Sequence, residues 1–277
     1  VVDALDPPSE LPASDLVIDA AFGTGFRGDW SAPAAVGRSG RPLVLAVDIP
    51  SGVDATTGAA GEGVLPADRT VTFQALKPGL LFGDGRRLAG EVTVADIGLD
   101  VGRADRYLVE RTDVATWWPT RAADAHKWRG AVRIVAGGAG MTGAARLCAA
   151  AAARAGASLV SLSTPGGEPG ARDEIISPSI PGAGFADAVL ADLDRFHALA
   201  VGPGVGRDDA VIDGVRRLVA EAAVPVVIDG DGLYASAWSP DDPAALIAPR
   251  ALPTVVTPHD GEYALLRGEP PGDDRIA

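Results

Sequence analysis

The 277-residue sequence contains one cysteine and three histidines, and only 5% of its residues are aromatic. Cys148 therefore has no intrachain disulfide partner, and this scarcity of cysteine favours a reducing compartment, which we expect to be the cytoplasm. Because Cys148 lies in an alanine-rich, helix-like run, we interpret it as a small buried residue. His126, His197 and His259 lack the close spacing of zinc ligands, so the sequence gives no indication of a zinc site.

Long apolar runs and basic clusters are also missing. The apolar runs are short or broken by Gly, Arg and Asp, whereas a membrane-spanning helix needs about 20 apolar residues. A net charge of −13 without Lys/Arg clusters argues against nucleic acid as a partner. The sequence starts at Val1, and its first fifteen residues lack the basic and apolar parts of a signal peptide. We expect a soluble piece of a longer protein.

Short β-branched runs alternate with helix-like stretches along the chain, which predicts α/β architecture with parallel sheets covered on both faces. Functional residues then lie beyond the carboxyl ends of the strands. The expected strand regions are 15–25, 41–52, 69–79 and 91–100 in the first half, and 130–140, 156–167, 198–206, 224–232 and 252–262 in the second; helices are expected at 142–156 and 208–223. A polar segment at 106–128 separates the two sets, so we predict domains at 1–106 and 107–277.

Acidic residues end two strands of the first half. "VIDAAFGTGFRGD" places Asp19 at a strand end, directly before the glycine-rich turn 23–29, whose backbone N–H groups could approach an anion. "VDIPSGVD" ends a strand in Asp48, where a carboxylate could act as acid or base or hold a ligand hydroxyl. Asp19 and Ser51 offer oxygens to a monovalent cation. Ordinary turn and capping roles remain the alternative, and we interpret Asp54 as a turn residue.

The second half has a glycine-rich turn after several strands. "VAGGAGMTGAA" combines strand, loop and helix as an anion-binding turn does, yet it matches neither the P-loop nor the G-x-G-x-x-G pattern. "VGPGVG" follows another strand, and "VIDGDGL" ends one in Asp229 and Asp231. "TPHDGE" places His259 at a strand end, where it is either a ligand contact or a structural residue.

Taken together and in order, these segments carry a family resemblance. "DAAFGTGFRGD", "VDIPSGVD" and the segment from "TFQALKPG" to "ADIGLD" resemble the NAD(P)H-hydrate epimerase domain. "HKWRG", "AGGAGMTGAA", "VGPGVG", "VIDGDGL" and "TPHDGE" resemble the ADP-dependent NAD(P)H-hydrate dehydratase domain. The resemblance implies a partial Rossmann-like domain followed by a partial ribokinase-like domain, and it extends over nearly the whole chain.

The resemblance implies repair of hydrated NADH and NADPH. One domain would interconvert the R and S epimers; the other would phosphorylate the S epimer with ADP and eliminate phosphate, giving NAD(P)H, AMP and phosphate. It also implies K⁺ in the epimerase domain, Mg²⁺ with the ADP, and an oligomer. Asp19 and Ser51 would bind K⁺, and Asp48 would be catalytic. The implied substrate contacts are Gly23, Thr24, Gly25, Phe26, Arg27, Gly28, Asp29, Asp48, Ala144, Gly204 and His259.

The chain departs from the family pattern at three places. It has no Asn-Asn-Gly-Gly-Asp loop before Asp19 and no late Gly-Thr-Gly-Asp motif, and Trp128 replaces the usual glycine of the His-Lys-Gly opening. We therefore expect the last part of one active site and the first part of another. A ribokinase-like kinase of a small alcohol and a non-catalytic nucleotide-binding fragment remain the alternatives.

Overall fold

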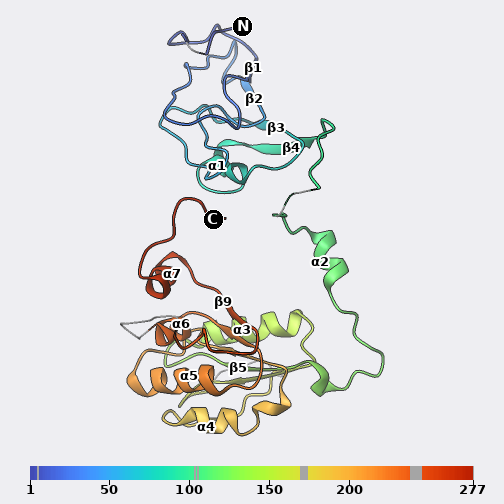
Figure 1. The fold of residues 1–277 in the computed structure, drawn as a ribbon, viewed down its shortest axis with the longest axis vertical. Coiled ribbons are helices and arrows are strands. Elements are labelled where there is room, and N and C mark those ends of the chain that lie inside the picture. Colours follow the sequence, from blue (N-terminus) through green and yellow to red (C-terminus); the bar gives the residue numbers. More distant parts are fainter. Residues whose placement is uncertain (5, 103, 105, 169–173, 238–244, 277) are drawn as a thin grey trace. The chain divides into compact units, whose positions relative to one another are not determined.

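The first of two parallel sheets has four strands in the order β1-β2-β3-β4 (Figure 1). The structure is a computed structural model that describes the chain except residues 5, 103, 105, 169–173, 238–244 and 277. The chain divides into two units, residues 1–117 with 272–277, and residues 118–271. This division falls inside the polar 106–128 segment, and the domain limits 1–106 and 107–277 stay a prediction.

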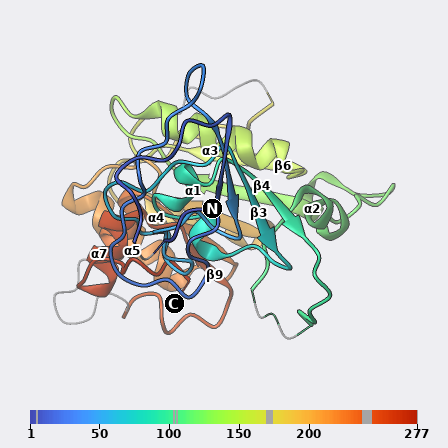
Figure 2. The same cartoon turned by 90° about the horizontal axis from the view of Figure 1, so that it is seen from above.

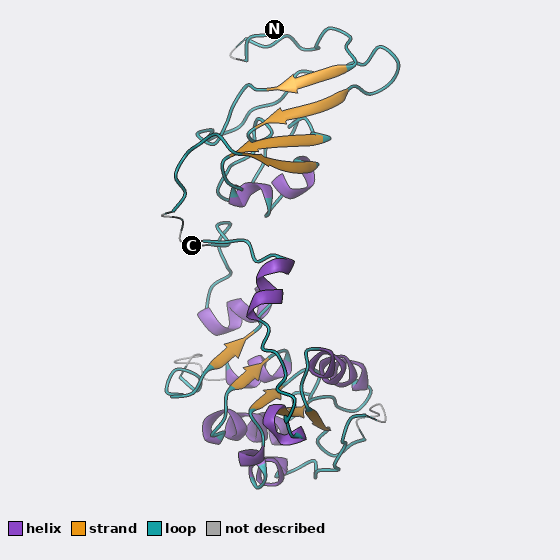
Figure 3. Cartoon of the chain, turned by 90° about the vertical axis from the view of Figure 1, so that its right-hand side faces the viewer, coloured by secondary structure: helices purple, strands orange, loops and turns teal. Residues whose placement is uncertain are grey.

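The four strands of the first unit lie side by side and run in the same direction (Figure 3). Asp19 pairs with Ala46, and Val47 with Val71, so the strand ends reach the same edge of the sheet. The strands are β1 (Leu16–Asp19), β2 (Leu43–Val47), β3 (Arg69–Phe73) and β4 (Glu91–Ala95); the helical turns are η1 (Pro78–Leu80), α1 (Gly85–Leu88) and α2 (Arg111–Trp117).

The two faces of this first sheet differ in burial. Val44, Ala46 and Thr70 point to the buried face, which is covered by the loops and helical turns that connect the strands. On the opposite face the side chains of Leu16, Ile18 and Leu43 are 51%, 60% and 63% exposed. The expectation of a sheet covered on both faces is therefore wrong for this unit as the structure describes it, although its apolar sequence pattern is that of a two-sided sheet.

The second unit contains a five-stranded parallel sheet in the order β6-β5-β7-β8-β9. After β5 the chain adds β6 on one side and then β7 on the other, so the strand order reverses next to β5. In open α/β sheets such a reversal opens a crevice at the carboxyl ends of the strands. The strands are β5 (Ala131–Val135), β6 (Leu159–Ser163), β7 (Ala198–Val201), β8 (Val226–Ile228) and β9 (Thr254–Val256).

Helices pack on both faces of this second sheet. On one face α3 contributes Ala145 and Ala149 to a core with Ile134 and Leu162, and it runs beside β6 (Figure 2). On the other face lie α4 and α5, whose apolar residues are spaced for a single buried stripe. The helical elements are η2 (Lys127–Gly130), α3 (Thr142–Arg154), α4 (Phe185–Leu190), η3 (Leu193–Arg195), α5 (Asp209–Glu221), α6 (Asp231–Ser236) and α7 (Asp260–Arg267).

The parallel sheets with alternating helices confirm the predicted α/β class. None of the helices in the described ranges combines the length and the apolar character that crossing a membrane requires.

Candidate functional site

A buried carboxylate and a buried serine meet at the end of β1. Asp19 is 7% exposed and Ser51 is fully buried. The Ser51 backbone N–H donates to Asp19 Oδ2 at 2.8 Å, and its hydroxyl donates to Oδ1 at 2.5 Å. The carbonyl oxygen of Phe22 lies 3.4 Å from Ser51 Oγ. Three oxygens of the kind that bind hard cations therefore lie close together. Asp19 and Ser51 were predicted from the sequence as such donors, whereas the Phe22 carbonyl was not.

Asp48 follows β2 in a left-handed conformation with φ 72°, which is uncommon for a residue other than glycine. Its Oδ1 accepts three hydrogen bonds, from Lys77 Nζ at 2.6 Å, Phe73 N at 3.1 Å and Thr72 Oγ1 at 3.2 Å. Burial acts to raise the pKa of Asp48, but Lys77 and the two other donors outweigh it and hold that pKa below its ordinary value. Asp48 is therefore a carboxylate at neutral pH.

The glycine-rich loop 23–29 starts next to Asp48. A Cβ placed on Gly23 would lie 3.6 Å from Asp48 Oδ2, so the loop approaches this oxygen through a residue without a side chain. Farther along, Arg27 Nη1 pairs with Asp54 Oδ2 at 3.3 Å beside a cavity of about 260 Å³, which the end of the loop helps to line. Asp54 also accepts bonds from the backbone N–H groups of Thr56 and Thr57, as a turn residue does.

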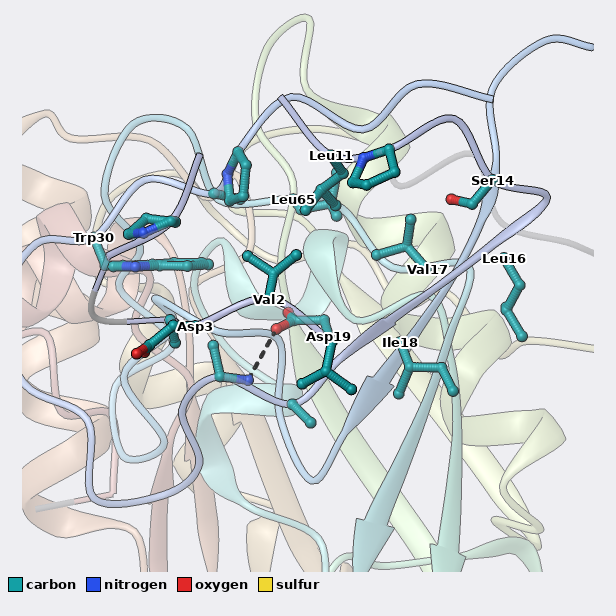
Figure 4. Close-up of a pocket in the computed structure, with 18 residues that line it drawn as sticks. Val2, Asp3, Leu11, Ser14, Leu16, Val17, Ile18, Asp19, Trp30 and Leu65 are labelled. Carbon is teal, nitrogen blue, oxygen red and sulfur yellow. Dashed lines mark hydrogen bonds between the residues drawn. The ribbon is translucent and has the colours of Figure 1, made fainter. Parts of the chain in front are cut away.

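A larger cavity of about 670 Å³ borders β1 (Figure 4). Its wall includes Leu16 to Ala21, the first residues of the chain and Trp30. Asp19 lies on this wall, and its Oδ1 accepts a weak bond from Ala21 N at 3.5 Å. The carboxylate that is paired with Ser51 therefore also borders open space.

Two contributors to this site were missed by the sequence interpretation, Lys77 and Thr72. Both follow or end β3, the strand that pairs with β2, so their position beside Asp48 results from the shared carboxyl edge of the sheet. The signal was present in "TFQALKPG", where a lysine closely follows a strand and precedes a proline.

In the second unit the glycine turns after β5 and β7 meet. Gly137 N donates to Pro203 O at 2.9 Å. Gly204 has φ 64°, and a Cβ there would lie 3.3 Å from the Ala144 side chain. Ala144 and Gly204, predicted separately as substrate contacts, are thus neighbours.

Asp231 and Asp229 brace the turns after β7 and β8. Asp231 Oδ2 accepts from Gly206 N at 3.1 Å, and its Oδ1 accepts from Arg207 Nε at 2.5 Å. Asp229 Oδ1 accepts from Thr257 Oγ1 at 2.8 Å, which ties the end of β8 to the end of β9. These carboxylates hold the turns in place, and no cluster of three or more His, Cys, Asp or Glu suited to a metal ion occurs in the ranges that the structure describes.

His259 caps α7. Its Nδ1 accepts from Gly261 N at 3.0 Å and Glu262 N at 3.3 Å, while Glu262 Oε2 accepts from His259 N at 3.0 Å. This reciprocal arrangement is a capping box. The side chain is nevertheless 74% exposed, and its Nε2 lies 3.4 Å from Glu262 Oε1. Among the described residues, the hydrogen bonds and the ion pair of the His259 side chain stay within its own helix and do not include Ala144 or Gly204.

Cys148 is half-buried on α3, and burial, together with the charge of Asp229, raises the pKa of its thiol. A thiol in such surroundings is a poor nucleophile. The structure thus gives no support for a reactive cysteine at this position.

Two family descriptions match the chain. The family described as NAD(P)H-hydrate dehydratase matches residues 132–277, and the family described as YjeF-related protein N-terminus matches residues 2–79. The first match runs from the second residue of β5 through α7 and contains both glycine turns. The second contains Asp19, Asp48, Ser51 and Lys77.

Curated relatives contain both parts in one chain. The bifunctional NAD(P)H-hydrate repair enzyme Nnr of Mycobacterium tuberculosis is 40% identical over 274 residues, which cover 95% of this chain and 54% of the relative. The enzyme of that name from Moorella thermoacetica is 40% identical over 277 residues, covering 92% and 51%. This chain therefore spans about half the length of the curated relatives it matches.

Among solved structures, the ADP/ATP-dependent NAD(P)H-hydrate dehydratase of Bacillus subtilis aligns with 24% identity and a TM-score of 0.41, covering 57% of this chain and 55% of that one. The fold of this chain is assigned from its own strand order and pairing, described above. Family membership follows from the match over residues 132–277, and the curated relatives with 40% identity agree with it. The chain belongs to the NAD(P)H-hydrate dehydratase family.

Proposed function

We propose that this protein takes part in the repair of hydrated NADH and NADPH. The first unit would interconvert the R and S epimers, and the second would dehydrate the S epimer with ADP. The observation that carries the proposal is the presence of both family matches in one chain. Each match contains a group of candidate site residues at the carboxyl ends of its strands. The anchored carboxylate of Asp48 faces the glycine loop in one, and Ala144 meets Gly204 in the other.

Epimerisation requires the ring carbon that carries the hydroxyl to become planar. The hydroxyl leaves with its electron pair while the ring nitrogen forms a C=N⁺ bond, and water then adds to the opposite face and loses a proton. An anionic Asp48 next to the ring would stabilise this cation and could accept the proton from water. The lowered pKa of Asp48 suits both tasks because they need the ionised form.

The first unit also offers part of a K⁺ site. Asp19 Oδ1, Ser51 Oγ and the Phe22 carbonyl are hard oxygen donors at one point, so their chemistry fits a monovalent cation. We propose Asp19 and Ser51 as K⁺ ligands, with the ion adding positive charge near a bound nucleotide. The residues 23–29 would contact that nucleotide through backbone N–H groups.

In the second unit the glycine turns would bind the hydrate and the nucleotide by close backbone approach, with Ala144, Gly204 and the exposed side chain of His259 as contacts. Phosphorylation turns the hydroxyl into a good leaving group, and phosphate then departs. Because the described ranges hold no cluster of metal ligands, Mg²⁺ would be bound mainly by the ADP phosphates and water. By family resemblance we further propose an oligomer, and the single cysteine favours the cytoplasm.

The test is to give the full-length protein a mixture of hydrated NADPH epimers, with and without ADP, and to follow the absorbance of the reduced nicotinamide. Complete recovery only with ADP would support both activities. Rapid recovery of the S fraction alone would remove the epimerase. No recovery would favour the small-alcohol kinase or a non-catalytic nucleotide-binding fragment.

Asp48→Asn sharpens this test because asparagine tolerates the left-handed backbone. We expect epimerisation to fall by about 100-fold or more while ADP-dependent dehydration of the S epimer is unchanged. Asp100→Asn, which changes an exposed acid of the same unit, is the matched control. Equal loss of both activities in Asp48→Asn would contradict two separate sites.

A further inference from the structure

The two oxygens of the Asp48 carboxylate have different surroundings. Oδ1 accepts from Lys77 Nζ, Thr72 Oγ1 and Phe73 N. Among the described residues no donor bonds to Oδ2, and Oδ2 lies 3.6 Å from where a Gly23 side chain would start. One oxygen is therefore fixed by the protein, while the other faces the glycine loop.

Lys77 is itself held in one position. Its ammonium donates to Asp48 Oδ1 at 2.6 Å, to Thr72 Oγ1 at 2.9 Å and to the Phe73 carbonyl at 2.7 Å. The side chains of Lys77 and Asp48 are only 17% and 16% exposed. An ammonium has three donors, so these contacts use all of them, and the ion pair is screened less than one at the surface.

The other charged groups nearby are engaged elsewhere. Arg27 pairs with Asp54, and Asp19 is bound by Ser51. Lys77 is the charged side chain that acts on Asp48.

We propose that Lys77, with Thr72, is a positioning residue that commits Asp48 Oδ1 to the protein and presents Oδ2 to the nicotinamide ring. This inference rests on the proposed epimerase function and deepens it by assigning which oxygen meets the substrate. Oδ2 is the atom that faces the planar cation and receives the proton of the added water. Lys77 acts through Asp48 and does not touch the ring.

The contact of Lys77 with Asp48 also determines the charge of the site. Without Lys77, burial would raise the pKa of Asp48 with only Phe73 N and Thr72 Oγ1 opposing it. Asp48 is ionised at pH values above its lowered pKa. Removing Lys77 raises that pKa, so the carboxylate becomes protonated at a higher pH than in the wild type. Epimerase activity should then fail at a less acidic pH than in the wild type.

The experiment compares Lys77→Met, Lys77→Arg and Thr72→Val in the full-length protein, measuring epimerase kcat, KM and the pH profile of kcat/KM. We expect Lys77→Met to lower kcat by about 100-fold with KM changed less than about threefold, because the carboxylate loses its orientation. Its acid limb should move up by about one pH unit or more. Lys77→Arg should keep the acid limb near the wild-type position, and Thr72→Val should lower kcat less than Lys77→Met does.

Two controls separate positioning from general destabilisation. Thr70→Val removes a buried hydroxyl from the same face of β3, where it donates to Ala89 O. Arg69→Met removes a cation from the other end of β3, where it pairs with Glu91. Both should leave the pH profile unchanged. Equal losses in the controls, or an unshifted acid limb with kcat within threefold in Lys77→Met, would overturn the proposal.

A direct titration of the Asp48 carboxyl by ¹³C NMR, in the wild type and in Lys77→Met, keeps this inference separable from the proposed function. A wild type without epimerase activity would overturn the proposed function and the catalytic role of the contact between Lys77 and Asp48. The titration would then still decide whether Lys77 holds the carboxylate, and identical titration curves would overturn that as well.

Discussion

Ser51 donates to both carboxylate oxygens of Asp19, from its backbone N–H to Oδ2 and from its hydroxyl to Oδ1. The pair joins the end of β1 to the loop after β2, and the Phe22 N–H completes it by donating to Ser51 Oγ at 2.9 Å. The buried Ser51 hydroxyl thus donates to Asp19 and accepts from the Phe22 N–H, and both of these partners lie at the end of β1.

Ser51→Ala should lower the free energy of unfolding of the first unit by about 1–3 kcal/mol, because a buried carboxylate oxygen and a backbone N–H lose their partner. Hydrogen exchange of the β1 and β2 amides under native conditions measures this locally. Ser31→Ala, which removes an exposed hydroxyl bonded to Glu62 O, is the control. Similar exchange in the two variants would contradict the prediction.

Gly204→Ala should impair the proposed dehydratase site more than Gly206→Ala. Both positions have positive φ, so both substitutions strain the backbone, but only at 204 would the new methyl group lie 3.3 Å from Ala144 and Met141. At 206 it meets open space. We expect a KM for the S epimer at least about tenfold higher in Gly204→Ala than in Gly206→Ala, as a close contact of this kind costs on the order of 1–3 kcal/mol. Equal KM values would show that Ala144 and Gly204 do not form one surface.

His259 variants can separate its cap from a substrate contact. His259→Ala should destabilise α7 by about 0.5–2 kcal/mol, whereas His259→Asn keeps a capping oxygen and should cost much less. Thermal unfolding measures the cap, and the KM for the S epimer measures the contact. A raised KM in His259→Asn at unchanged stability is the result we expect. Normal KM in that variant would leave His259 with the cap alone.

Arg133 is a buried cation in β5 whose Nε lacks a partner among the described residues, although its guanidinium donates to Ser161 and lies 5.7 Å from the centre of the Phe196 ring. Burial lowers the pKa of Arg133, with the charge of Asp192 opposing that effect. Arg133→Met should leave the free energy of unfolding unchanged or raise it by about 1 kcal/mol, because an apolar side chain of similar length avoids the desolvation.

The matching change, Asp192→Ala, should lower that free energy by about 2 kcal/mol or more, since it leaves the buried cation without its counter-charge. Urea unfolding of the two variants checks the pair. A loss in Arg133→Met that equals the loss in Asp192→Ala would mean that the charge interaction between the two residues stabilises the second unit.

Much of the first site could be predicted because parallel strands end at one edge of their sheet. Asp19, Asp48 and Ser51 were found by reading the residues directly after each apolar run, and the sheet register brings them to that edge. Lys77 could not be found in this way, because it reaches Asp48 from a loop whose path depends on the turn after β3. The open face of the first sheet was also missed, since a buried and an exposed face carry the same apolar residues in these strands.

In the second unit the sequence located the turns correctly but not their internal chemistry. The contact of Ala144 with Gly204 depends on how α3 packs beside β5, which no short motif encodes. For His259 a signal was available. Glu262 stands three residues after a strand-end residue, which is the spacing of a capping box.

The exposed side chains of Leu16, Ile18 and Leu43 lie on and beside β1, an edge strand of its sheet. An apolar face next to an open edge is a template for self-association. The net charge of −13 repels neighbouring copies at low ionic strength, and added salt screens that repulsion without weakening apolar contacts. The polypeptide should therefore stay dispersed in dilute buffer and form oligomers or aggregates as the salt concentration rises, the reverse of a protein whose association is electrostatic.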